Sequence, residues 1–135
     1  MGYKSIFAPG LFQGRTIIVT GGGSGIGRCT AHELAHLGAR VVIVGRNPEK
    51  LATVAGELAE DGGAATAMTC EIREDKNVIS IIDRTLEAFG SIDGLVNNAG
   101  GQYRTEMKTI STKGFEAVVR NNLTGGFIFM REAYL

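Results

Sequence analysis

The 135-residue sequence predicts an α/β protein built on a doubly wound parallel sheet. Short apolar runs rich in β-branched residues alternate four times with longer segments of helical periodicity. The connections between them are short and often contain glycine. The apolar runs are nearly continuous, which is typical of strands covered on both faces. We therefore expect three layers, with helices on both sides of an incomplete sheet of about four strands joined by right-handed crossovers.

Each expected strand is a short run bounded by glycine or polar residues. The first, TIIVT, is largely β-branched and leads directly into glycines. The second, ARVVIV, has the same character, whereas AATAMTC and IDGLVN are less apolar. The four expected strands are residues 16–20, 39–44, 64–70 and 92–97.

The expected helices carry start and stop signals as well as apolar periodicity. Gly38 and Gly90 end the first and third helices, and Pro48 suits the first turn of the second. Ser111 is a suitable N-cap for the last helix, in which Gly125 and Gly126 form a weak point. The four expected helices are residues 25–37, 48–60, 74–89 and 112–135.

Composition narrows the classes of function. Fourteen basic and fourteen acidic residues give a net charge of zero, which argues against a nucleic-acid partner. Cys29 and Cys70 do not form a disulfide framework, so a reducing, cytoplasmic location is expected. The longest apolar runs are too short to span a membrane. Residues 1–15 are expected to form an extended arm, and residues 16–135 a single domain.

A glycine motif follows the first strand and opens the first helix. Gly21, Gly25 and Gly27 allow a tight turn and a close approach of the backbone to a pyrophosphate. The positive end of the helix and its free N–H groups favour a phosphate at the same place. A merely tight turn is the weaker alternative, because the motif has the strand–loop–helix context that a nucleotide site needs.

The same helix contains a second motif, His32-Glu33-x-x-His36, which matches a zinc-peptidase site. The two histidines share a face, but it is the outer face, opposite the apolar stripe that we expect to contain Ile26 and Leu34. A third ligand would have to be acidic, such as Glu57 or Glu60. We favour two histidines that point into solvent, and we expect no metal site.

The end of the second strand indicates which nicotinamide cofactor binds. An acidic residue there would favour NAD, but the sequence has Gly45 and then Arg46. A guanidinium suits the 2′-phosphate of NADP(H), and Ser24 could assist. Arg46 as an ordinary surface residue is the alternative, and Lys50 could equally well be solvated.

Two asparagine motifs lie where the sheet and the last helix would place polar groups near a ligand. Asn97-Asn98-Ala99-Gly100 closes the fourth strand, and ligands of open α/β sheets bind beyond strand carboxyl ends. Asn121-Asn122 and Gly125 weaken the helix in which they lie, as functional residues often do. The alternatives are an asparagine-rich turn and a surface pair.

Three motifs together resemble the short-chain dehydrogenase/reductase family: Thr20-Gly21-x-x-x-Gly25-x-Gly27, Asn97-Asn98-Ala99-Gly100 and Asn122-Leu123-x-Gly125. The resemblance implies a Rossmann sheet that binds NAD(P)(H). It implies that Arg46 holds the 2′-phosphate and that Asn122 is a catalytic residue that bends its helix and holds a water in a proton relay. It further implies cofactor contacts at Gly21, Ser24, Gly25, Ile26 and Gly27 with the pyrophosphate and ribose, Glu71 and Ile72 beside adenine, and Asn98, Ala99 and Gly100 near the adenine ribose and nicotinamide.

A narrower resemblance is to the peroxisomal trans-2-enoyl-CoA reductases and their bacterial relatives. It rests on the stretches 8–11, 70–73, 97–103 and 111–115. It implies NADPH-dependent reduction of an acyl-CoA thioester at the β-carbon of the enoyl group. A carbonyl reductase of the same family and an NADP-binding module without catalysis are the alternatives.

Family members are longer, and their catalytic serine and Tyr-x-x-x-Lys follow the asparagine motif. Tyr103 and Lys108 have the wrong spacing and lie too early. The sequence is therefore expected to be the N-terminal portion of a longer enzyme and to be inactive as it stands. The fourth strand would otherwise leave an exposed apolar edge of the sheet, so the alternative is that another chain covers this edge. The resemblance also implies a homo-oligomer, either a dimer or a tetramer.

Overall fold

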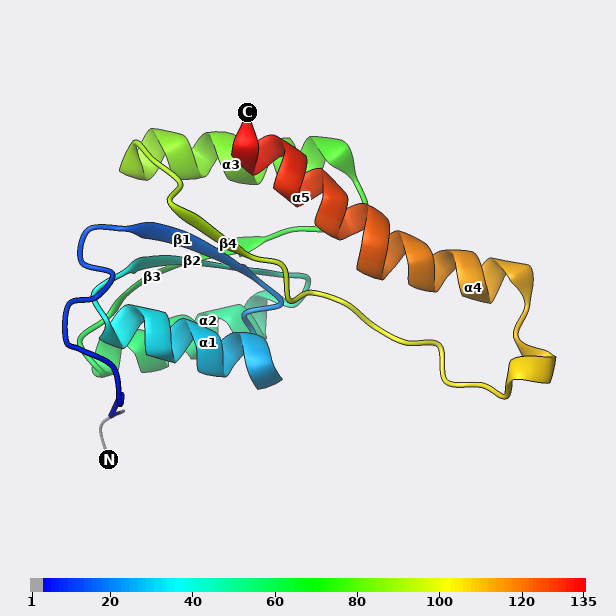
Figure 1. Cartoon of the computed structure of the whole chain (residues 1–135), viewed down its shortest axis with the longest axis horizontal. Helices are drawn as coiled ribbons and strands as arrows, with labels where there is room; N and C mark the ends of the chain where they lie inside the picture. Colours follow the sequence, from blue (N-terminus) through cyan, green and yellow to red (C-terminus); the bar gives the residue numbers. More distant parts are fainter. Residues whose placement is uncertain (1–3) are drawn as a thin grey trace.

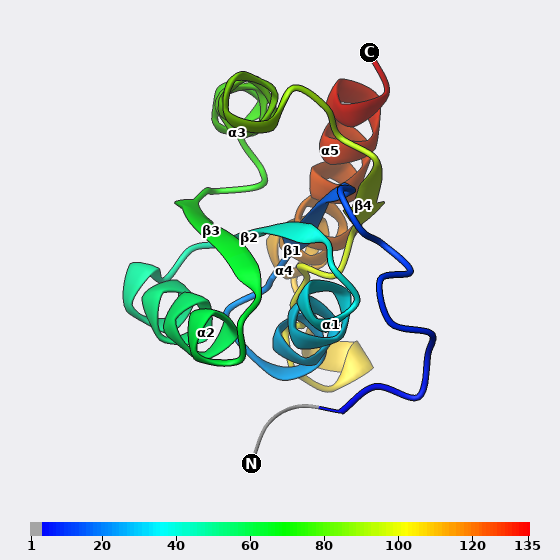
Figure 2. The ribbon, with the colours of Figure 1, turned by 90° about the vertical axis from the view of Figure 1, so that its left-hand side faces the viewer.

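The computed structural model describes residues 4–135 and has a four-stranded parallel sheet with helices on both faces (Figures 1 and 2). The strand order is β3-β2-β1-β4, so the chain builds outward from β1 to β3 and then crosses back to β4. The strands are β1 (Thr16–Thr20), β2 (Arg40–Gly45), β3 (Ala64–Thr69) and β4 (Gly94–Val96). The predicted fold class is confirmed, and the fourth strand is shorter than expected.

The helices are α1 (Gly25–His36), α2 (Pro48–Glu60), α3 (Asp75–Phe89), α4 (Thr112–Val119) and α5 (Gly125–Tyr134). Ser111 caps α4 as predicted, because its hydroxyl accepts from the Gly114 N–H at 3.0 Å. The expected single helix over 112–135 is instead divided by a π-helical turn, Arg120–Thr124. Figure 1 shows that the connection from β4 and helix α4 extend beyond the end of the sheet. Within residues 4–135, no helix is both long and apolar enough to cross a membrane.

Two separate cores lie on the two faces of the sheet, because successive side chains of a strand point to opposite faces. Ile17 and Val19 of β1 pack with α1 and α2, and Ile18 packs with α3 and α5 on the other face. Leu34, Leu51, Val54 and Leu58 complete the first core, and Val78, Ile81, Ile82, Ile128 and Phe129 complete the second.

The two central strands are the most deeply buried strands of the sheet. All residues of β1 and four of the six in β2 are buried, as their β-branched sequences predict. Met68 is the one buried residue of β3, and the residues of β4 are half-buried. Ala65 and Val96 nevertheless pack against the first core and Met68 and Leu95 against the second, so both faces of these edge strands are covered as expected, although less completely than those of β1 and β2.

The segment before β1 forms turns rather than an extended arm. The Gln13 N–H donates to the Gly10 carbonyl, and the Phe12 N–H donates to the Leu37 carbonyl at 2.9 Å. Phe12 packs against the core between the sheet and α1, which fixes this segment on the domain. Residues 1–3 of the predicted arm lie outside the described residues.

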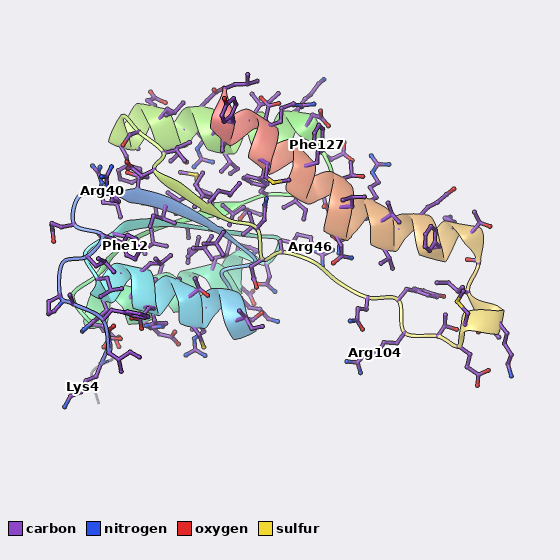
Figure 3. The ribbon with its side chains drawn as sticks, in the orientation of Figure 1. Lys4, Phe12, Arg40, Arg46, Arg104 and Phe127 are labelled. Atoms are coloured by element: carbon purple, nitrogen blue, oxygen red, sulfur yellow. The ribbon has the colours of Figure 1, made fainter. Side chains whose placement is uncertain are left out.

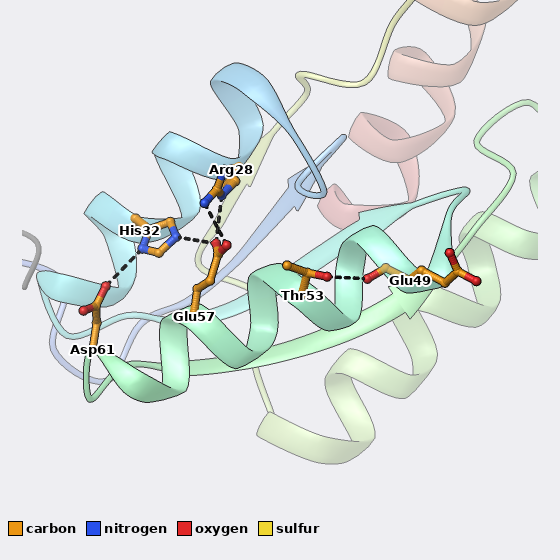
Figure 4. Close-up of polar contacts among 6 residues, drawn as sticks. All are labelled: Arg28, His32, Glu49, Thr53, Glu57 and Asp61. Atoms are coloured by element: carbon orange, nitrogen blue, oxygen red, sulfur yellow. Dashed lines mark hydrogen bonds and ion pairs between the residues drawn. The ribbon is translucent and has the colours of Figure 1, made fainter.

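Helices α1 and α2 are joined by a polar cluster that includes the first histidine of the second motif (Figure 4). Arg28 donates two hydrogen bonds to the Glu57 carboxylate, at 2.8 and 2.7 Å. His32 lies between two carboxylates, with Nε2 3.2 Å from Glu57 and Nδ1 3.4 Å from Asp61. The side chain of His32 is 14% exposed, so the expectation that both histidines face solvent was wrong for His32. His36 is exposed as predicted.

This arrangement does not resemble a metal centre. Both oxygens of the Glu57 carboxylate accept from Arg28, and His32 presents its two nitrogens to different acids. In the part of the chain that the structure describes, no group of three or more His, Cys, Asp and Glu side chains could hold a metal ion.

The cluster predicts an acid-sensitive contribution to stability. Hydrogen bonding from Arg28, above all, lowers the pKa of Glu57 in the folded protein. The resulting stabilisation is present above the ordinary glutamate value of 4.5 and is lost as the pH falls through the lower folded-state value. Glu57→Gln should lower the free energy of unfolding by roughly 1 kcal/mol at pH 7 and by less at pH 4. Urea unfolding at both pH values checks this prediction.

The matched control is Glu60→Gln, which removes an exposed carboxylate from the same helix. It should leave the pH dependence of the wild-type protein unchanged. An equal destabilisation by Glu57→Gln at both pH values would contradict the proposed linkage.

Candidate functional site

The candidate site lies at the carboxyl ends of β1 and β4, which are neighbours in the sheet although β2 and β3 come between them in the sequence. β2 and β3 extend from one side of β1, and β4 pairs with its other side. The loops that follow β1 and β4 therefore leave the same edge of the sheet in different directions. Such switch points form the ligand crevice of open α/β sheets.

The hydroxyl of Thr20 joins the ends of these two strands. It donates to the Val96 carbonyl at 3.2 Å and accepts from the N–H groups of Asn98 and Ala99, each at 3.0 Å. The Asn98 amide donates in return to the Thr20 carbonyl at 3.0 Å. Thr20 is 1% exposed, so these bonds are made away from solvent. Together they hold the asparagine segment against the glycine loop.

The glycine loop has the geometry that a phosphate group needs. Gly21 and Gly25 have φ values of 68° and 53°, which favour glycine. A Cβ atom on Gly27 would overlap the Gly21 carbonyl, so position 27 in the first turn of α1 must be glycine for the helix to pack against the loop. A Cβ on Gly25 would meet nothing within 4 Å among the described residues. The backbone at Gly25 is therefore open at the positive end of α1, as phosphate binding requires.

A cavity of about 420 Å³ extends from this loop across the ends of β2 and β3. Arg46 and Lys50 bring positive charge to its rim, and Figure 3 shows Arg46 near the meeting point of the strand ends. Asn47 caps α2 by accepting from the Lys50 N–H at 3.0 Å. The lining residues are Gly21, Gly23, Ser24, Gly25, Ile26, Gly45, Arg46, Asn47, Lys50, Leu51, Cys70, Ile72, Asn98, Ala99, Gly100 and Asn121.

Two ionisable groups at the end of β3 have shifted pKa values. Burial, followed by the charge of Glu71, raises the pKa of Cys70 to about 11, so the thiol stays protonated at neutral pH. Hydrogen bonding from Arg73 lowers the pKa of Glu71, and the charges of Arg73 and Arg46 act in the same direction. Glu71 is therefore an ionised carboxylate within electrostatic reach of Arg46.

Asn122 lies in the π-helical turn and binds the loop after β4. Its side-chain amide donates to the Gly101 carbonyl at 2.6 Å and to the Val118 carbonyl at 2.8 Å, and its carbonyl accepts from the Gly101 N–H at 3.1 Å. The bond to Val118 takes the acceptor that an α-helix would give to the backbone N–H of residue 122. The Gly125 N–H then bonds the Arg120 carbonyl, five residues back. The Asn122 side chain thus replaces a backbone hydrogen bond where the α-helix is interrupted, and it also holds the loop at Gly101 in place.

Most of the predicted cofactor residues line this one cavity. The exceptions are Gly27, which packs beneath the loop, and Glu71, whose carboxylate turns toward Arg73. Ile26 was expected in the buried stripe of α1, but it is 78% exposed and lines the cavity. Its position in the first helical turn, beside the loop, explains the difference. Asn122 contacts Gly101, and its neighbour Asn121 faces the cavity.

Sequence reasoning missed Asn47 and Cys70 as lining residues, and it considered Asn121 only as part of the Asn121-Asn122 pair. Cys70 directly follows β3 and Asn47 lies two residues beyond the end of β2, so the rule that ligands bind at strand carboxyl ends could have found both. Nothing in the sequence distinguishes the orientation of Asn121 from that of Asn122. Taken together, the sheet, its switch point and the glycine loop define an α/β protein of the dinucleotide-binding class.

Comparison with known proteins identifies the family. The family model for short chain dehydrogenase matches residues 15–134. The chain therefore belongs to the short-chain dehydrogenase family, as its motifs predict. Members of this family are oxidoreductases that use a nicotinamide cofactor.

Individual relatives differ in their named activities. A solved structure of a citronellol catabolism dehydrogenase (AtuB) from Pseudomonas aeruginosa PAO1 is 57% identical, with a TM-score of 0.93 over 98% of this chain and 54% of that one. A 2,5-dichloro-2,5-cyclohexadiene-1,4-diol dehydrogenase of Sphingobium indicum is 40% identical over 88% of this chain and 47% of its own. A peroxisomal 2,4-dienoyl-CoA reductase of Mus musculus is 34% identical over 93% and 43%. The chain thus spans about half the length of these relatives.

Structural neighbours with bound cofactor differ in which one they hold. An NAD⁺-bound xylitol dehydrogenase is 31% identical with a TM-score of 0.87, covering 91% of this chain and 48% of its own. A variant of actinorhodin polyketide ketoreductase with NADPH is 34% identical with a TM-score of 0.85, covering 88% and 46%. The fold therefore accommodates both cofactors.

The junction at Thr20 predicts a specific loss of stability. Thr20→Val keeps the shape of the side chain but removes the hydroxyl, which leaves the N–H groups of Asn98 and Ala99 without this acceptor. The free energy of unfolding should fall by about 2–4 kcal/mol. Chemical denaturation measures the loss. Thr20→Ser, which keeps the hydroxyl, should recover most of the difference, and equal stabilities of the valine and serine variants would contradict the role of the hydroxyl.

Proposed function

We propose that this chain is the cofactor-binding part of an NADPH-dependent oxidoreductase that acts on a small molecule. The single observation that carries the preference for NADPH is the position of Arg46, which directly follows β2 at the rim of the cavity. A guanidinium at this position can donate a charge-assisted fork to a 2′-phosphate. Lys50 and the capped N-terminus of α2 add positive potential at the same rim.

The proposed cofactor contacts follow the cavity wall. Gly21, Gly25 and the first turn of α1, with Ser24 and Ile26, would hold the pyrophosphate and its ribose. Ile72 would contact adenine, and Asn98, Ala99 and Gly100 would line the path toward the nicotinamide. The cofactor, when bound, supplies a hydride. Asn122 is proposed to serve the reaction by holding the loop after β4 in place and a water in the proton relay.

Two substrate classes are supported by different observations. The stretches 70–73 and 97–103, with the 34% identity to a peroxisomal 2,4-dienoyl-CoA reductase, favour reduction of a 2-enoyl-CoA thioester. The 57% identity to a citronellol catabolism dehydrogenase favours an alcohol or carbonyl compound of that catabolism. We favour the enoyl thioester as the substrate. The alternatives are that the protein is a carbonyl reductase or a non-catalytic NADP-binding module.

Assembly and location are also proposals. Phe115, Leu123, Phe127 and Met130 expose apolar surface along α4 and α5, which supports a homo-oligomer. A dimer or a tetramer located in the cytoplasm is proposed on the family resemblance.

The cofactor proposal is tested by fluorescence titration with NADPH and NADH. Wild-type protein should bind NADPH more tightly, and Arg46→Ala should weaken NADPH binding by about tenfold because it removes a charge-assisted contact. NADH binding should change little, since NADH has no 2′-phosphate. Equal affinities for the two cofactors in both proteins would refute the role of Arg46.

The substrate proposal is tested by steady-state kinetics, with NADPH, of the full-length enzyme of which this chain is proposed to be the cofactor-binding part. A 2-enoyl-CoA thioester should be reduced with a higher kcat/KM than a ketone of matched chain length. Citronellol with NADP⁺ serves as the competing assay. Turnover of citronellol alone would reject the thioester proposal, and cofactor binding without turnover of any of the three would favour the non-catalytic module.

A further inference from the structure

One asparagine of the cavity wall has an amide that the fold does not use. Asn47, Asn98 and Asn121 all line the cavity. Asn47 caps α2, and the Asn98 amide donates to the Thr20 carbonyl. Asn121 is half-buried, and within residues 4–135 its side chain makes no hydrogen bond. Its amide is therefore free to bond a molecule that occupies the cavity.

Two glycines leave room for the two adjacent amides of the π-helical turn. A Cβ atom on Gly100 would overlap the side-chain oxygen of Asn122, and one on Gly101 would lie 2.9 Å from Nδ2 of Asn121. Asn122 uses this space to bond both the N–H and the carbonyl of Gly101. Asn121 lies beside the same backbone without bonding to it. The Asn121 side chain is thus confined against the loop, at a place where it lines the cavity.

The neighbours of Asn121 place it on the side of the cavity where β3 ends. Gly125 follows one helical turn later, and a Cβ atom there would lie 2.9 Å from Cδ1 of Ile72. Residues four apart lie on the same side of a helix, so Asn121 shares the side that packs toward Ile72. Arg120, directly before Asn121, has a terminal nitrogen 3.8 Å from a carboxylate oxygen of Glu74. Ile72 is the residue proposed to contact adenine, so Asn121 belongs to the adenosine end of the cavity.

We propose that Asn121 is a binding residue for the adenosine half of the cofactor, and that its amide forms a hydrogen bond with the adenine or with its ribose. The inference rests on the proposed function, in which the cofactor occupies this cavity. An amide has both donors and an acceptor, and the hydroxyl groups and ring nitrogens of adenosine complement both. The bond does not involve the 2′-phosphate, so it applies to NADPH and NADH alike.

Desolvation is the physical reason for preferring a bonded amide over a solvated one. A cofactor that fills the cavity displaces water from the Asn121 side chain. A polar group that loses water without gaining a hydrogen bond weakens the binding that displaced the water. An apolar residue would then serve better at position 121. The amide is favourable at this position when the bound molecule bonds it.

The test compares binding of the whole cofactor with binding of its adenosine half by the full-length enzyme. The ligands are NADPH, adenosine 2′,5′-bisphosphate and 5′-ADP. Asn121→Leu removes the amide and keeps a side chain of similar size. It should weaken binding of all three ligands by the same factor, about three- to tenfold, as expected for one neutral hydrogen bond. Asn77→Leu is the matched control, because Asn77 is exposed on α3 and outside the cavity lining, and it should change none of the dissociation constants.

Two further measurements separate the lost hydrogen bond from a change in structure. Asn121→Ala leaves space instead of filling it, so it should show the same losses if the leucine acts by removing the amide. In steady-state kinetics, the KM for the cofactor should rise in both variants while kcat at saturating cofactor stays the same, because adenosine is remote from the transferred hydride.

The outcomes distinguish this inference from the proposed function. Unchanged affinity for the two adenosine ligands in both variants, or a loss confined to the whole cofactor, would overturn this inference alone while the effect of Arg46→Ala stands. A wild-type enzyme that prefers NADH would overturn the proposed preference for NADPH, and the 5′-ADP measurement would still decide the role of Asn121. A wild-type enzyme that binds none of these ligands would overturn both.

Discussion

The hydroxyl of Thr20 is the contact on which the candidate site depends. A parallel sheet brings strand ends to one edge but does not by itself fix the loops that leave it. The hydroxyl donates a hydrogen bond to the Val96 carbonyl and accepts from the N–H groups of Asn98 and Ala99, which joins the end of β1 to the end of β4. The glycine loop and the asparagine segment, separated by more than seventy residues, thereby become two walls of one cavity. The cost of burying a hydroxyl is offset because every bond it can make is made.

The fold could be predicted from the sequence because the local signals for each helix and strand agree with the pattern of buried residues. The β-branched runs of β1 and β2, the proline of α2 and the serine cap of α4 each specify their elements without distant contacts. The boundaries of β4 were less predictable, because β4 pairs with only three of the five residues of β1, and the sequence does not show how far this pairing extends. The exposure of β3 depends on its place in the strand order, which periodicity does not contain.

The candidate site was predictable as far as backbone geometry determines it. Glycines and strand ends are visible in the sequence, so the cavity and most of its wall could be located. Side-chain partners were not visible. The pairing of Glu71 with Arg73 and the position of His32 between Glu57 and Asp61 depend on which way each side chain turns. These side-chain orientations depend on which charged groups lie nearby in the folded protein, and the spacing of residues along the sequence does not predict them.

The π-helical turn between α4 and α5 has a consequence for chain length. A turn with one additional residue rotates everything after it by about 100° relative to a continuous α-helix. Ile128 and Phe129 face the sheet in this phase, while Asn122 faces the loop after β4. Deleting one residue between 120 and 124 would regularise the helix and yet turn this apolar pair away from the core. The number of residues in this turn is therefore fixed by the packing on either side of it, so an insertion or a deletion would misplace either Asn122 or the apolar pair.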